Sequence, residues 1–80
     1  MIKLTSIGYQ QDNVVATVEY DLDGEIYQLT VYAKLLLVAK MTEVEVKDYI
    51  RGKVSAERVA RVKDAATALL NAILDVDIEE

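Results

Sequence analysis

The clearest pattern in the chain is an apolar stripe with helical spacing near its C-terminal end. Between Ser55 and Val76 successive members of the stripe are 3, 4, 3, 4 and 3 residues apart: Val59, Val62, Ala66, Leu69, Ile73 and Val76. This spacing lays the six side chains along one face of an α-helix about 30 Å long. The sequence therefore predicts a long helix over residues 56–76, capped by Ser55, whose apolar face packs on the rest of the domain.

The first third of the chain alternates apolar and polar residues with a period of two, which predicts strands at about 2–8, 14–22 and 25–33. Asp23-Gly24 is a dipeptide that favours a two-residue hairpin turn. With this loop apolar residues oppose apolar residues, so the register is well specified. The expected pairs are Leu22 with Glu25, Tyr20 with Tyr27, Val18 with Leu29 and Ala16 with Val31.

Two shorter segments join the third strand to the long helix. Residues 34–41 fit either a short buried helix or a continuation of the strand, and their leucine and alanine content favours the helix. Thr42 and Glu45 have the spacing of a capping box, which predicts a helix over 43–51. Gly52 is expected to end this helix as its C′ residue.

These elements predict a single α+β domain over residues 1–80, in which an antiparallel three-stranded meander is followed by helices packed on one face. The long helix is expected to cover the sheet face that carries Ile2, Leu4, Ala16, Val18, Leu29 and Val31. Residues 77–80 form an acidic tail that we expect to fray.

Charge divides the chain unevenly. The formal net charge is −5, yet residues 40–63 contain seven basic and four acidic residues, whereas the rest contains two basic and ten acidic residues. An uneven distribution of this kind favours docking through one charged pole but does not name the partner.

The residue types needed for catalysis are scarce. The chain has no histidine and no cysteine, so the commonest general base, metal ligand and thiolate nucleophile are missing. The segment Asp21-Leu22-Asp23-Gly24-Glu25 lacks the further ligands of an EF-hand calcium loop, and its hairpin role already explains Asp23 and Gly24. We expect no enzyme activity, no catalytic residues, no cofactor and no metal site.

We therefore expect a small non-enzymatic interaction protein that binds and modulates or inhibits another macromolecule. Small acidic domains without catalytic residues are frequent among phage-encoded proteins, including anti-CRISPR inhibitors of host defence; this analogy rests on size and composition, not on a motif. The expected contacts are the acidic hairpin and a tyrosine on the open sheet face, with salt-sensitive binding to a protein partner: Glu19, Asp21, Asp23, Glu25 and Tyr32.

Two alternatives belong to other functional classes. The first is a DNA-binding transcriptional regulator, because residues 43–63 contain two predicted helices and a glycine turn, as in a helix-turn-helix. Its nucleic-acid contacts would be Arg51, Lys53, Arg58, Arg61 and Lys63. The second alternative is a structural or assembly subunit.

Self-association and location complete the expectations. Small size, 52% hydrophobic residues and two exposed sheet edges predict a homodimer, formed by edge pairing or by the helix seam. The longest apolar run, Leu35 to Ala39, is far shorter than the roughly 20 residues that span a bilayer, and no signal peptide is evident. We expect no membrane association and a cytoplasmic location, in the host cytoplasm if the protein is phage-encoded.

Overall fold

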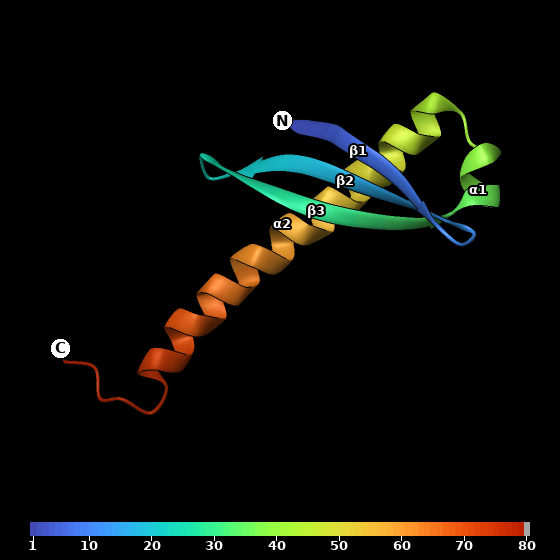
Figure 1. Ribbon diagram of the computed structural model, residues 1–80. Coiled ribbons are helices and arrows are strands. Elements are labelled where there is room, and N and C mark those ends of the chain that lie inside the picture. The colour runs from blue at the N-terminus through green and yellow to red at the C-terminus, as the bar shows by residue number, and fades with distance from the viewer. Residues whose placement is uncertain (80) are drawn as a thin grey trace.

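The computed structural model describes residues 1–79. Its elements are β1 (Ile2–Gln10), β2 (Asn13–Leu22), β3 (Glu25–Lys34), α1 (Leu35–Ala39) and α2 (Glu43–Ile73). The strands form one antiparallel sheet in the order β1-β2-β3, and α2 crosses one of its faces diagonally (Figure 1). The predicted α+β meander followed by helices is confirmed.

The β2–β3 hairpin has the register that the sequence predicts. Tyr20 pairs with Tyr27 and Leu22 with Glu25, and the other two predicted pairs are also present. Asp23 (φ 52°) and Gly24 (φ 82°) both adopt left-handed backbone conformations, as a type I′ turn requires.

Strand β1 is longer than predicted and contains a bulge. Leu4 pairs with Val18, but the register shifts between Leu4 and Ser6, after which Ile7 pairs with Ala16. The extra residue moves Ile7 onto the sheet face that carries Leu4. The alternation therefore continues past Gly8, where we expected the strand to end, as far as Gln10.

The two segments that follow β3 are both helical: the first forms α1, and the second forms the start of α2. Residues 35–39 are helical rather than a strand continuation, but the helix is not buried as predicted: Leu35, Leu36 and Leu37 are exposed. Thr42 caps α2 with the complete capping box: its hydroxyl accepts from the Glu45 backbone N–H at 3.2 Å, and the Glu45 carboxylate accepts from the Thr42 N–H at 3.0 Å. The bond from the Thr42 backbone N–H to the ionised carboxylate holds the pKa of Glu45 below its ordinary value.

The predicted break between a 43–51 helix and a 56–76 helix is wrong. Helix α2 is continuous through Gly52, which has no positive φ, and Ser55 lies inside the helix instead of capping it. Val46, Ile50 and Val54 recur every four residues across the glycine, so one face of the helix packs on the sheet on both sides of it. Tertiary packing here outweighs the low helix propensity of glycine.

This correction predicts that Gly52→Ala stabilises the protein. A Cβ built on Gly52 has no neighbouring atom within 4 Å, and alanine removes the entropic cost of glycine inside a helix. We expect the free energy of unfolding, measured by urea denaturation, to rise by about 1 kcal/mol. A helix that ended at Gly52 in a left-handed conformation would give the opposite sign.

The core lies under the first part of α2. Val18, Tyr20 and Val31 of the sheet and Val54 of the helix are the buried apolar residues within residues 1–79. Leu22, Tyr27, Leu29, Tyr49 and Ile50 pack against them. The helix covers the predicted sheet face, but it does so with its N-terminal part.

The predicted packing of the 56–76 apolar stripe on the sheet is therefore wrong. Helix α2 passes beyond the sheet (Figure 1), and every described residue from 62 onward is exposed, including Leu69 at 73%. The helix also ends at Ile73, three residues earlier than predicted, and Asp75 follows with a left-handed backbone (φ 61°). We call residues 62–73 the distal segment.

The protruding helix gives the molecule an elongated shape of 59 × 25 × 18 Å. Its radius of gyration is 17.5 Å, whereas a compact domain of this length has about 12 Å. A single chain thus leaves a large part of its longest element without tertiary contacts.

Candidate interaction surfaces

Arg58 ties α2 to the end of the β2–β3 hairpin. Its Nε donates to the Asp21 carbonyl at 2.9 Å, and its Nη2 donates to the Asp21 carboxylate at 2.9 Å. The Met1 ammonium group binds the same carboxylate oxygen. Arg58 from the predicted nucleic-acid set and Asp21 from the predicted acidic set therefore neutralise each other.

Arg61 occupies a similar position one turn further along α2. Its Nε donates to the Tyr20 hydroxyl, its guanidinium carbon lies 4.0 Å from the centre of the Tyr27 ring, and Glu57 lies 3.6 Å away. The Tyr27 hydroxyl donates to the Glu25 carboxylate at 2.8 Å, and this bond raises the pKa of Tyr27. Arg61 and Glu25 are thus engaged within the fold, where the cation–π contact holds the helix on the hairpin.

Two carboxylates of the predicted acidic set are left for a partner. Glu19 and Asp23 enter no ion pair within residues 1–79. Asp23 is exposed in the turn, and Glu19 is half-buried between Lys3 of β1 and Gln28 of β3 on the sheet face turned away from α2. The hairpin therefore presents less free negative charge than the sequence suggests.

The sheet face opposite α2, which we call the open face, carries exposed apolar and polar side chains. Ile26 and Tyr32 of β3 are 64% and 59% exposed, with Gln28 and Thr30 between them on the same face. No element among residues 1–79 covers this face (Figure 1). Tyr32 therefore lies on the open face, as predicted, beside Val15 of β2.

The basic residues predicted for nucleic-acid contact do not form one surface. Arg51 pairs with Asp48 at 2.6 Å, and Lys53 lies 5.4 Å from the centre of the Tyr49 ring. Lys53 and Lys63 point in different directions around the helix, because ten residues turn it through about 1000°, which is about 80° short of three full turns. The helix-turn-helix arrangement itself is wrong, because a continuous α2 has no turn between 43 and 63.

The Asp21 cluster predicts a specific pH dependence of stability. The hydrogen bond from the Met1 ammonium, aided by Arg58, lowers the pKa of Asp21 below its ordinary value. Its contribution is therefore complete above the unfolded-state pKa of about 3.9 and is lost as pH falls through the lower folded-state pKa. Urea denaturation should show Asp21→Asn less stable than the wild type near pH 6, with the difference shrinking below pH about 4. A difference that is constant with pH would contradict this role.

The hollows on the surface are open grooves, and the one between the hairpin and α2 is lined by charged side chains that include Asp23, Glu25, Arg61 and Asp64. The groove between β1 and α2, of about 530 Å³, is lined by Ile2, Leu4 and Ile50 and by the Glu43–Lys47 ion pair of 2.9 Å, which lowers the pKa of Glu43. Residues 1–79 contain no cluster of three or more side chains of the kind that ligates metal. In the same part of the chain, neither helix combines the length and the apolar character needed to cross a membrane.

Sequence reasoning missed two features of these surfaces. The Arg58–Asp21 bond joins residues 37 positions apart and has no local signal. The exposure of the distal segment did have one: Val46, Ile50 and Val54 already supply a helix face for the sheet, so the 59–76 stripe is a second apolar surface. The sequence matches no protein-family model, and comparison with curated proteins and with solved structures likewise finds no match.

Proposed function

We propose that the protein is a non-enzymatic interaction protein that binds another macromolecule through its open face and hairpin and so modulates or inhibits it. The observation that carries the proposal is the uncovered sheet face with exposed Ile26 and Tyr32. Tyrosine and apolar side chains at the centre of a patch, with charged groups beside them, are typical of protein interfaces.

The free carboxylates favour a partner with a basic surface. Asp23 lies in the turn next to the open face, and Glu19 lies on that face. Negative charge beside an apolar patch steers a positively charged partner and makes its binding sensitive to salt. A basic groove that normally holds nucleic acid has this chemistry. By size and composition the proposal includes phage-encoded inhibitors of host defence, such as anti-CRISPR proteins, acting in the host cytoplasm.

The test is capture of partners from lysate with neutralised hairpin variants. The double variant Glu19→Gln, Asp23→Asn keeps side-chain shape and suits the left-handed backbone at position 23. The matched control, Asp12→Asn with Asp77→Asn, changes net charge equally but at exposed positions away from the hairpin. Capture is compared at about 0.05 M and about 0.5 M salt.

The proposal expects one protein that the wild type and the control retain at low salt, and that is shed at high salt and by the hairpin variant. Tyr32→Ser should weaken capture without changing its salt dependence. Equal retention by the hairpin variant, or recovery of nucleic acid alone, would contradict the proposal.

A second candidate function, a structural or assembly subunit, is favoured by the exposed distal segment. It predicts particles well above the mass of a dimer, which light scattering measures directly. A mass at or below that of a dimer would exclude it.

A further inference from the structure

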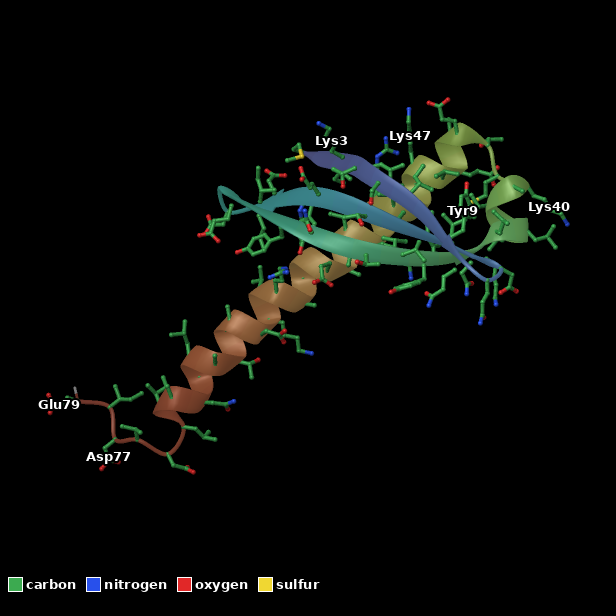
Figure 2. All side chains as sticks on the ribbon, viewed as in Figure 1. Lys3, Tyr9, Lys40, Lys47, Asp77 and Glu79 are labelled. Atoms are coloured by element: carbon green, nitrogen blue, oxygen red, sulfur yellow. The ribbon has the colours of Figure 1, made fainter. Side chains whose placement is uncertain are left out.

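The distal segment is a helix that its own chain does not support. All its residues are exposed. Its first turn borders the groove beside the hairpin, and Figure 2 shows the rest of the helix extending away from the sheet. Isolated helices of about 12–15 residues are marginal in water, and most helical stability in proteins comes from packing of an apolar face. A stable distal segment therefore requires a partner surface.

The exposed area of the chain has the magnitude of a dimer interface. A compact monomer of 8.9 kDa has about 4,800 Å² of accessible surface, whereas this chain exposes 6432 Å². The excess is about 1,600 Å², and a stable interface of standard size buries about 800 Å² on each partner. Beyond the surface of a compact monomer, the chain therefore exposes more than enough area for an interface of standard size.

The apolar residues of the distal segment form a narrow seam suited to another helix. Val62, Ala66, Leu69 and Ile73 of the distal segment, with Val59 one turn before them, keep the 3-4 spacing of coiled-coil a and d positions. We call these five residues the seam. At 3.6 residues per turn the seam lies about a quarter turn from the direction in which Val54 meets the sheet. The seam is therefore accessible to a partner while α2 stays docked on its own sheet.

We propose that the seam packs against the seam of a second copy of this chain, with the two α2 helices antiparallel. In this register the a and d positions of one copy face the d and a positions of the other. Val62 faces Ile73 and Ala66 faces Leu69, and the same pairs repeat by two-fold symmetry, so every helical layer joins apolar side chains. The small side chain of Ala66 lies at the centre of the seam, so the two helix axes can approach closely there.

Charge decides between the antiparallel and parallel orientations. The last turn of α2 has no basic residue to balance the helix dipole, and the acidic tail with Asp75, Asp77 and Glu79 follows it (Figure 2). The antiparallel register brings Lys63 of the second copy, which enters no ion pair within residues 1–79, to this end of the helix. A parallel pair would instead place Lys63 beside Arg58 of the other copy and bring the two acidic tails together.

The sheets do not obstruct this pairing. In the antiparallel register the two Val54 residues, each at the centre of its own core, are 27 helical positions apart, or about 40 Å along the axis. Each core therefore lies beyond the end of the other copy's helix. The hairpin shares a groove with Arg61, Val62 and Ala65, so it comes alongside only the last turn of that helix, and both open faces remain accessible. The proposal does not depend on which macromolecule binds there.

The first test is the mass of the full chain in solution by light scattering. The wild type should have twice the mass of 8.9 kDa. Leu69→Asp should give the single-chain mass, because it places a carboxylate at the centre of the seam. Leu36→Asp makes the same change at an exposed leucine of α1 and should leave the dimer intact. A wild-type monomer, or a dimer that survives Leu69→Asp, would overturn the proposal, and circular dichroism of the variants verifies that they fold.

The second test fixes the orientation. The chain has no cysteine, so spin labels can be attached at Ala56→Cys or Asn71→Cys, both exposed positions. The antiparallel register separates the paired labels by about 35 Å along the axis at position 56 and by about 10 Å at position 71. Electron–electron dipolar measurements should show this difference. Equal distances at the two positions would indicate a parallel pair and overturn the proposed register.

Discussion

Val54→Asp is expected to unfold the protein. Val54 is the one fully buried residue of α2 within residues 1–79, and it packs against Val18, Tyr20 and Val31. A carboxylate there would be buried without a partner, which costs about 4 kcal/mol or more. Since an 80-residue domain has a total stability of about 4–12 kcal/mol, that loss exceeds or nearly exceeds the whole.

The measurement is the circular dichroism spectrum together with urea denaturation. Val54→Ala should give a folded variant destabilised by about 2 kcal/mol, because it removes two methyl groups and leaves a small cavity. Thr67→Asp makes a similar change at an exposed position of the same helix and should leave stability nearly unaltered. A folded Val54→Asp variant as stable as Thr67→Asp would show that α2 does not dock on the sheet through Val54.

Tyr20→Ala is the second change with a large expected effect, a loss of about 3–5 kcal/mol, as for other large aromatic residues of cores. The Tyr20 ring is fully buried, stacks on Tyr27 with 5.8 Å between ring centres, and lies under the guanidinium groups of Arg58 and Arg61. Its removal leaves a cavity and frees both arginines from the hairpin.

The conservative variant Tyr20→Phe separates packing from hydrogen bonding. It keeps the ring but removes the oxygen that accepts from Arg61, so we expect a loss of only about 1 kcal/mol. Urea denaturation of the two variants measures both losses. A Tyr20→Phe variant as unstable as Tyr20→Ala would assign most of the stabilisation to the hydrogen bond instead of to the ring.

The elements that could be predicted from the sequence are those with a local cause. The β2–β3 register follows from the Asp23-Gly24 turn and from period-two alternation, and the start of α2 follows from the Thr42 capping box. In each case the residues that specify the geometry are close together in the chain, so their chemistry can be interpreted without knowledge of the fold.

The misplaced elements depend on contacts between distant segments. Gly52 resembles a helix C′ residue until the packing of Ile50 and Val54 on the sheet is known, because those contacts hold the helix straight through it. The same applies to the candidate site: Asp21 and Arg58 each look like a free charge in the sequence, yet α2 brings them to 2.9 Å.

The two proposals together give the protein a simple organisation. An antiparallel pair of α2 helices would place two open faces at opposite ends of a dimer, with the cores about 40 Å apart. Such an arrangement could hold two binding sites of one assembly and would gain avidity there without further contacts. Leu69→Asp would then weaken capture of a repetitive partner, whereas the hairpin variant would abolish capture and leave the dimer intact.

The most direct measurement of the central claim is amide hydrogen exchange of the distal segment as a function of protein concentration. If a second copy covers the seam, residues 62–73 should be protected at concentrations that favour the dimer and lose protection on dilution, while amides near Val54 stay protected throughout. Protection of residues 62–73 that is independent of concentration, or absent at every concentration, would contradict the pairing of two chains through this helix.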